Sequence, residues 1–251
     1  MRPNREWRYA SAVEAMNDKE RDGAKMQQSV AFFEYLIGGA KATALVGGVA
    51  YLLAIALGFA AGIARAERIP IARTIAFVYV EIFRGTSLIV QLFWIYYSLP
   101  LMGVSISPLM AGCLGIGLNS GAYASEIVRG ALLSIPGAQL EAAAALDLNR
   151  YQTLRKIVIP QAVREMAPPF GNLSIAILKD TALVSMISIA DIAFKAQQLR
   201  TFTYNSAGIY SVSLVIYFGM ALVLLVTSRT VEYYARPKYQ RSWSLFRRAA
   251  Q

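Results

Sequence analysis

Residues 42–64 read ATALVGGVAYLLAIALGFAAGIA, and none of these side chains carries a charge. A helix of this length is ~35 Å long at 1.5 Å per residue, so it can cross the ~30 Å hydrocarbon core of a bilayer. Gly58 and Gly62 have the GxxxG spacing that lets helices approach closely, and we expect them to pack within one subunit. Residues 210–227, YSVSLVIYFGMALVLLVT, form a second apolar stretch. Because 56% of the chain is hydrophobic, the sequence predicts an all-α membrane protein.

Apolar stretches along the chain predict five membrane-spanning helices, at 42–64, 74–99, 108–132, 168–190 and 209–231. The second of these contains Glu81 and Arg84, and the fourth contains Lys179 and Asp180. These two segments therefore fail a strict test for charge-free spans. We nevertheless include them in the predicted set of five.

The basic loops predict the orientation of the chain. Arg and Lys are concentrated in the loop 65–73, in the loop 133–167 and in the C-terminal tail 236–251. With five spans these regions share one side, which the positive-inside rule assigns to the cytoplasm. The N-terminal tail, residues 1–31, then lies outside, ahead of a membrane domain over 32–235. That tail is itself rich in Arg and Lys, so a sixth span that would place it inside is the alternative.

Charge and composition exclude several classes of function. The formal net charge is +10, but the basic residues lie at the ends of apolar segments and form no face interleaved with aromatic residues. We therefore expect contact with membrane lipid and none with nucleic acid. The chain has no His and a single cysteine, Cys113. This excludes a disulfide framework, and no metal site is expected.

The loop 133–167 contains an unusual stretch, EAAAALDLNRYQTLRKIVIP, at residues 141–160. Alanine is the best helix former, and residues 139–148 predict a helix of ~15 Å. A Pro-Gly pair precedes this helix, and Pro160 is expected to stop the segment after it. An alanine-rich helix can enter a narrow groove on another protein, with Glu141 at the rim, or it can lie on the lipid headgroups. Composition alone leaves both possibilities open.

The same stretch, extended as EAAAALDLNRYQTLRKIVIPQA, resembles the EAA motif of permease subunits in ATP-binding-cassette importers. Asp147 stands where Gly is usual, and Ile159 stands where Leu is usual. In that family the motif forms a coupling helix that docks into a cleft on a cytoplasmic ATPase. The resemblance therefore implies coupling roles for Glu141, Ala142, Ala143, Asp147, Ile157 and Pro160.

Three further stretches are similar to the polar amino-acid branch of these permeases: EIFRGTSLIVQLFWIYYSLP (81–100), GAYASEIVRGAL (121–132) and LKDTALVSMISIADI (178–192). The resemblance implies a bacterial inner-membrane importer subunit that pairs with a second permease, identical or homologous. An extracytoplasmic substrate-binding protein and a dimer of ATPases, which bind ATP and Mg²⁺, would complete the assembly. This chain would then hold no cofactor and no catalytic residue. Consistently, GGAKAT at 38–43 lacks the Gly-Lys-Ser/Thr end of a phosphate-binding loop.

Ionisable side chains within a span are costly and usually face a partner or an aqueous path. Glu126 and Arg129 are three residues apart, as are Glu81 and Arg84, so each pair shares a helix face. Lys179 lies midway along the fourth span, and its partner is expected to be Glu126 or the carboxylate of a passing solute. The candidate residues of a substrate pathway are Asn119, Glu126, Lys179, Asp180, Thr181 and Arg84.

Several functions other than polar amino-acid import are alternatives. Within the same class, the solute could be an amino-acid derivative such as an opine or an ectoine-like compound. From other classes, the chain could be a stand-alone channel or a membrane-embedded enzyme. A channel has no need of the EAA helix, and a hydrolase needs a nucleophile and a base that the sequence does not plainly offer. Copurification with an ATPase would separate these possibilities.

Overall fold

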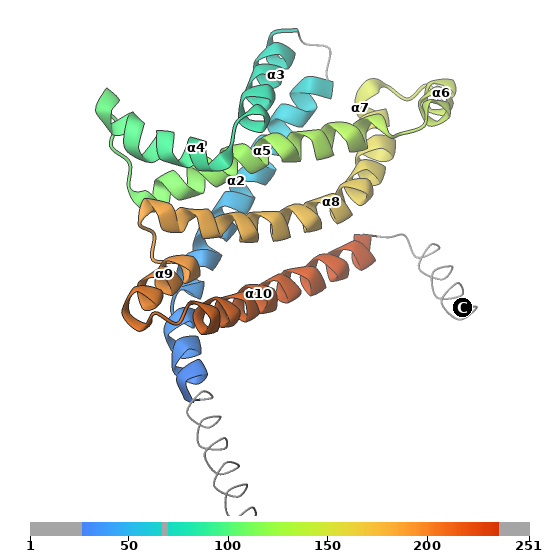
Figure 1. The fold of residues 1–251 in the computed structure, drawn as a ribbon. Coiled ribbons are helices and arrows are strands. Elements are labelled where there is room, and N and C mark those ends of the chain that lie inside the picture. The colour runs from blue at the N-terminus through green and yellow to red at the C-terminus, as the bar shows by residue number, and fades with distance from the viewer. Residues whose placement is uncertain (1–26, 67–69, 236–251) are drawn as a thin grey trace, which may run out of the picture.

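The computed structural model describes residues 27–66 and 70–235, and within these ranges every regular element is a helix (Figure 1). Residues 27–37, which include the end of the expected N-terminal tail, are already helical. The expected C-terminal tail lies outside the described residues. In chain order the further elements are α2 (Ala40–Ala66), α3 (Pro70–Gly85), α4 (Leu88–Phe93), η1 (Trp94–Ser98), η2 (Leu99–Met102), α5 (Pro108–Leu133), α6 (Gly137–Ala145), α7 (Arg150–Thr153), η3 (Leu154–Val158), α8 (Ile159–Asp180), η4 (Thr181–Ile187), α9 (Ile192–Thr203) and α10 (Ser206–Ala235).

Three helices in the described ranges are long and apolar enough to cross a membrane: Gln27–Ala66, Arg150–Ile187 and Ser206–Tyr234. They contain the first and fifth predicted spans, and the fourth as far as Ile187. The pair Pro70–Gly85 and Leu88–Met102 passes the same test together, but it is bent by 104°. It is therefore a broken span or a re-entrant loop. The described residues thus hold three or up to four candidate spans, where five were predicted.

The third predicted span, 108–132, is one continuous helix, α5, but it is not among the candidate spans. Its sequence is diluted by Gly, Ser and Asn. More than half of its residues are buried inside the subunit, so α5 faces other helices more than lipid. Small residues are favoured at such contacts because they let the backbones approach.

The contact between α2 and α5 confirms the predicted role of the GxxxG pair. A Cβ atom on Gly58 would lie 2.4 Å from the Cβ atom of Ala124, and one on Gly62 would lie 2.7 Å from that of Val128. Both distances are shorter than real Cβ contacts allow. Residue numbers rise together along the two helices, so α2 and α5 run parallel. The two glycines therefore pack within one subunit.

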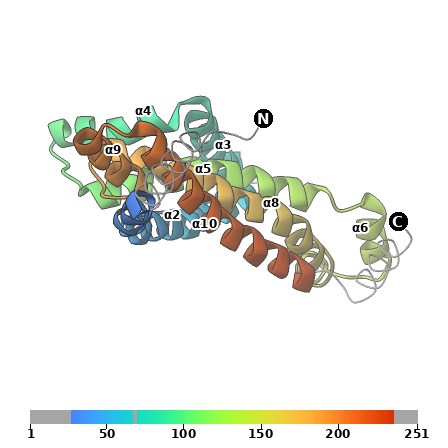
Figure 2. The ribbon, with the colours of Figure 1, turned by 60° about the horizontal axis from the view of Figure 1, so that its bottom comes forward.

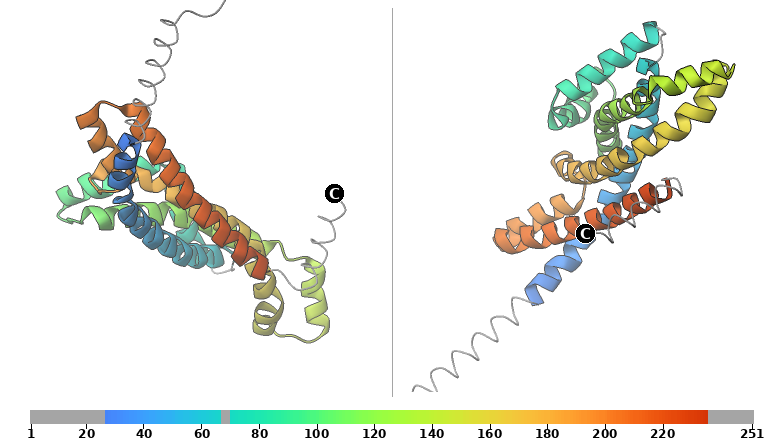
Figure 3. Two further views of the ribbon diagram at one scale, coloured as in Figure 1. Left: turned by 90° about the horizontal axis from the view of Figure 1, so that it is seen from below. Right: turned by 90° about the vertical axis from the view of Figure 1, so that its right-hand side faces the viewer.

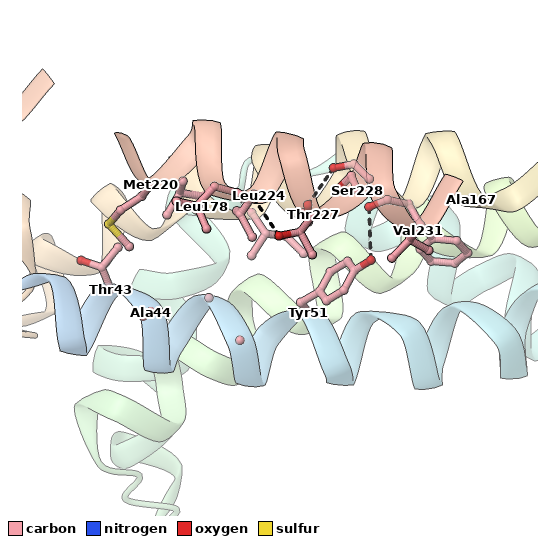
Figure 4. A pocket seen from close by; sticks show the side chains of 17 residues that line it. Thr43, Ala44, Tyr51, Ala167, Leu178, Met220, Leu224, Thr227, Ser228 and Val231 are labelled. Atoms are coloured by element: carbon pink, nitrogen blue, oxygen red, sulfur yellow. Dashed lines mark hydrogen bonds between the residues drawn. The ribbon is translucent and has the colours of Figure 1, made fainter. Parts of the chain in front are cut away.

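The directions of the remaining long helices show which helix ends lie together at each end of the bundle. Along α8 and α10 the order is reversed, because Leu178 lies near Met220 whereas Ala167 lies near Val231 (Figure 4). Helix α8 is thus antiparallel to α10, and it is also antiparallel to α5. Figures 2 and 3 show the outcome: α9 and the start of the described chain lie at one end, and α6 and the end of α10 lie at the other.

Two predicted segments differ from the structure. The span expected over 74–99 is broken between Gly85 and Leu88, and its second half passes through a π-helical turn, η1, and a 3-10 turn, η2. The fourth span begins far ahead of residue 168, because the helix is continuous from Arg150 to Ile187. Pro160 lies inside it and stops nothing. The π-helical turn η3, just before α8, widens the backbone where the proline ring would clash and where its missing N–H leaves a carbonyl free.

Candidate coupling and translocation sites

The predicted coupling helix is α6, Gly137–Ala145, at the same end of the bundle as the close of α10. Glu141 and Ala142 are exposed on it, whereas Ala143 is only 1% exposed. Ala143 therefore packs inside the subunit, and Glu141 and Ala142 are the motif residues of α6 that a partner can reach. The side-chain amide of Gln161 in α8 donates to the side-chain carbonyl of Gln139, which ties α6 to the start of α8.

The turn after α6 depends on Asp147, which has a left-handed backbone with φ of 53°. Gly, the usual residue at this place in the EAA motif, adopts this conformation freely, and Asp tolerates it better than most residues. The N–H groups of Asp147 and Leu148 donate to the carbonyls of Ala144 (3.0 Å) and Ala143 (3.1 Å). These bonds satisfy carbonyl groups that the end of a helix leaves open. The chain can therefore reverse sharply into α7 with few unpaired backbone groups.

Helix α7 starts with a capping box that residue-type patterns could have revealed. Asn149 accepts the Gln152 N–H at 2.9 Å and its own N–H donates to the Gln152 side chain at 3.0 Å. The two other EAA positions follow in the same continuous helix: Ile157 is half-buried in η3, and Pro160 is exposed near the start of α8. The motif thus forms a helical hairpin, of which α6 is one arm.

Exposed apolar side chains surround this hairpin. Leu140 and Leu146 on and after α6 are 44% and 73% exposed, and Tyr151 on α7 is 66% exposed. Large apolar groups grouped in this way mark contact surfaces more often than single exposed ones do. Sequence reasoning singled out the alanines and the glutamate and missed these three residues.

The carboxylate of Glu126 on α5 is the centre of an ion-pair cluster. Its Oε1 atom accepts from NH1 of Arg65 at 2.8 Å and from NH1 of Arg84 at 3.0 Å, and its Oε2 atom accepts from Nε of Arg129 at 3.1 Å. The pairing of Glu126 with Arg129 was predicted. Arg84, expected to pair with Glu81, reaches Glu126 instead. Arg65 was counted only as a loop charge, because its partner becomes visible only once α2 and α5 are packed in parallel.

Asn119 is buried, and its side chain forms hydrogen bonds to residues on both sides of the break between α3 and α4. Its amide donates to the Phe83 carbonyl at 2.8 Å and to the Gln91 side chain at 3.1 Å. Gln91 donates to the same carbonyl at 2.9 Å and to the Thr86 hydroxyl at 2.7 Å. Buried backbone groups need such partners, so this network stabilises the break. Gln91 was not among the predicted residues.

Lys179 and Asp180 lie at the end of α8, away from the Glu126 cluster. Lys179 is exposed and Asp180 half-buried, and both line a surface pocket of about 370 Å³ on one side of α8. No ion pair joins Lys179 to Glu126, whose partners among the described residues are arginines. Thr181 is fully buried, and its hydroxyl donates to the Leu178 carbonyl at 2.6 Å. Of the three adjacent residues, Thr181 therefore does not line the pocket.

The predicted pathway residues therefore lie at two depths. Gly112 of α5 lies against Val184, and Val128 lies in one cluster with Met166 of α8. Helices α5 and α8 are antiparallel, so the position of Lys179 can be projected onto α5. The projected point lies ~14 Å from Glu126 along the helix axis, at 1.5 Å per residue. The Lys179 pocket is thus nearer the α9 end, and the Glu126 cluster is nearer the α6 end.

A larger groove of about 550 Å³ lies between α2, α8 and α10 (Figure 4). Its lining is mainly apolar, and its hydroxyl groups are largely bonded to the protein itself. The Tyr51 hydroxyl donates to the Phe170 carbonyl at 3.3 Å, and that of Thr227 donates to the Val223 carbonyl at 2.8 Å. Such a lining suits hydrocarbon rather than the ammonium and carboxylate of an amino acid.

Comparison with known proteins agrees with this geometry. A family model described as the inner membrane component of binding-protein-dependent transport systems matches residues 54–236. A probable amino-acid ABC transporter permease of Sinorhizobium fredii is 47% identical over 69% of this chain and 76% of its own length. The glutamine transport system permease of Escherichia coli is 38% identical over 78% of this chain and 91% of its own length. A crystal structure of an amino acid ABC transporter with histidines matches with a TM-score of 0.77 and 30% identity, over 82% of this chain and 96% of the solved one.

Fold and sites together define a helical transport subunit of the membrane. Because the family model covers most of the chain, the protein belongs to the family of inner-membrane components of binding-protein-dependent transport systems. It is a multi-pass permease subunit of an ATP-binding-cassette importer, as the resemblance of the EAA stretch indicated.

Proposed function

We propose that this permease subunit imports polar amino acids and couples their passage to ATP hydrolysis by a separate cytoplasmic ATPase. One observation carries the proposal: the hairpin of α6 and α7 exposes Glu141 and Ala142 beside large apolar side chains. A docking face of this kind suits a groove on a partner protein better than a layer of headgroups. The relatives named above, which are described as permeases for amino acids, support the solute class.

The proposed topology has five crossings, in which the bent pair α3–α4 counts as the second and α5 as the third. The odd number agrees with the ends of the described chain lying at opposite ends of the bundle. Basic residues near α6 and after α10 favour the cytoplasm for that end. The N-terminus would then lie outside.

The proposed assembly has two permease subunits, a dimer of ATPases and an extracytoplasmic substrate-binding protein. A second permease, identical or homologous, is needed because the Lys179 pocket opens at the surface of this chain. Two such surfaces facing each other would enclose a path. Binding of ATP by the ATPases, transmitted through the coupling hairpins, would favour either the inward-facing or the outward-facing state of the path.

The test is transport by the reconstituted assembly. The chain is purified with its ATPase, placed in proteoliposomes with ATP at the α6 side, and supplied with the binding protein and labelled glutamine, arginine or cystine. ATP-dependent accumulation of at least one of these is expected. Glu141→Lys should abolish it at normal abundance, whereas Thr201→Lys, which adds the same charge on exposed α9, should leave it intact. Uptake of none by the wild-type assembly, or full uptake by Glu141→Lys, contradicts the proposal.

A further inference from the structure

The Glu126 cluster contains more positive than negative charge. One carboxylate faces three guanidinium groups, at 2.8, 3.0 and 3.1 Å. In the part of the chain that the structure describes, these arginines have no second acidic partner within ion-pair distance. Arg65 lies in the last turn of α2, so the cluster is near the end of this helix. Charged side chains that face the bundle usually meet a partner or an aqueous path.

The three arginines differ in how accessible they are. The side chain of Arg65 is 9% exposed and also reaches the Ser125 hydroxyl, so it holds α2 against α5. The side chains of Arg84 and Arg129 are 39% and 38% exposed. Arg65 is therefore a structural residue, whereas the other two can meet a molecule from outside the subunit.

Arg84 and Arg129 retain unused hydrogen-bond donors. A guanidinium group has five N–H bonds. Arg129 uses Nε toward Glu126, so both of its terminal nitrogens are left, and Arg84 uses NH1. The Arg84 guanidinium carbon lies 5.4 Å from the centroid of the Tyr123 ring, which holds its plane in place. Planar forks of this kind bind carboxylate groups with two hydrogen bonds.

We propose that Arg84 and Arg129 form a second station on the solute path, one that binds the carboxylate of the amino acid after it leaves the Lys179 pocket. This inference rests on the proposed function. The two stations are separated by ~14 Å along α5, which is too far for one small amino acid to occupy both. The station recognises the carboxylate that all amino acids share, and selectivity for the side chain lies elsewhere.

A chemical footprint tests the station directly. The ATPase-bound complex, without nucleotide, is placed in nanodiscs of phosphatidylcholine and treated with phenylglyoxal, which modifies accessible arginines. L-glutamine and L-asparagine, which carry no guanidinium group to consume the reagent, should each slow modification of Arg84 and Arg129 severalfold. Their alcohol analogues, which lack the carboxylate, should not. Arg164, exposed on α8, is the internal control and should react equally in all samples. Equal reaction of Arg84 and Arg129 in every sample overturns the proposal.

An anionic lipid offers similar chemistry through its phosphate, and a second arm distinguishes it. Nanodiscs that also contain phosphatidylglycerol are treated without any amino acid. If the lipid alone protects both arginines, and added amino acid gives no further protection in either disc, the site belongs to lipid and the proposal is wrong. Unchanged reactivity in the mixed discs, together with protection by amino acid, supports it.

Transport by variants gives the third arm. Arg129→Gln should lower the maximal uptake rate about tenfold, as loss of a charge-assisted bond predicts. The half-saturating solute concentration, set by the binding protein, should stay unchanged. Arg164→Gln is the matched control. If the double variant Arg84→Gln/Arg129→Gln transports at the wild-type rate, the proposal of a second station is wrong. Uptake by that variant would still support the proposed function. If a variant accumulates poorly, the footprint on the wild-type chain still decides.

Discussion

The Tyr217 hydroxyl in α10 donates to Oδ2 of Asp191 at 3.2 Å, and this bond joins α10 to the start of α9. Asp191 caps α9, because its Oδ1 accepts the N–H of Phe194 at 2.8 Å. The carboxyl group is completely buried and lies outside the candidate spans. Burial raises the pKa of Asp191 above its ordinary value, although these hydrogen bonds oppose the shift.

The first prediction follows from this raised pKa. The folded protein holds the Asp191 proton more tightly than the unfolded chain does. The wild type therefore loses stability as the pH rises from the pKa of Asp191 in the unfolded chain to its pKa in the folded protein. Asp191→Asn removes this loss and keeps the cap, since Asn and Asp cap equally well. Thermal unfolding of purified protein should show the variant to be the more stable at pH 7, with the difference shrinking in acid. Asp191→Ala should lose about 1–2 kcal/mol. A difference that grows in acid would contradict this.

The second prediction concerns the contact between α2 and α5. Gly58→Val places a branched side chain against Ala124, where even one Cβ atom is too close. The helices must separate, at a cost of about 1–3 kcal/mol or more, and the folded fraction in detergent should fall. Gly219→Ala in α10, where nothing lies within 4 Å of the new methyl group, is the control. Equal yields of monodisperse protein from both variants would show that α2 and α5 can accommodate a larger side chain at this contact.

The third prediction uses the left-handed backbone of Asp147. Gly adopts φ of 53° freely, and Asp tolerates it better than most residues. Asp147→Gly should therefore retain transport, whereas Asp147→Val should lose most of it, because a β-branched side chain resists this conformation. Uptake at matched abundance is the measurement. Equal uptake by the two variants would show that the turn imposes no backbone demand.

The fourth prediction concerns Lys179. A buried pair of Lys179 with Glu126 would make Lys179→Met fold poorly, because a carboxylate would be stranded. In the structure Lys179 is exposed and Glu126 is paired with arginines. We therefore expect Lys179→Met to accumulate normally while uptake and substrate-stimulated ATP hydrolysis fall. Low abundance that Glu126→Gln restores would instead establish the pair.

Local chemistry made part of the fold predictable. The apolar stretches located most of the long helices. The EAA motif usually has Gly where Asp147 stands, and that Gly is compatible with a left-handed turn. The i, i+3 spacing also gave the pair Glu126 and Arg129. Each of these depends on residues close in sequence.

What could not be predicted depends on contacts between distant helices. Arg65 meets Glu126 only because α2 and α5 run parallel, and the break after Gly85 is stabilised in part by a donor that Asn119 supplies from α5. Helix α5 was predicted, but its burial among the other helices depends on contacts that the apolar stretch alone does not reveal. Pro160 is tolerated because a π-helical turn precedes it, which residue propensities do not reveal.

The unbroken helix from Arg150 to Ile187 has a mechanical consequence. Its 38 residues correspond to ~57 Å, with α7 and the exposed Tyr151 at one end and Lys179 well toward the other. A loop between them would absorb motion, whereas a helix transmits more of it, and Pro168 and Pro169 inside α8 are where this helix can bend. A displacement of the hairpin would therefore be carried along this helix. The pocket at Lys179 and Asp180 lies toward the end of the helix that is far from the hairpin, so it would receive this displacement.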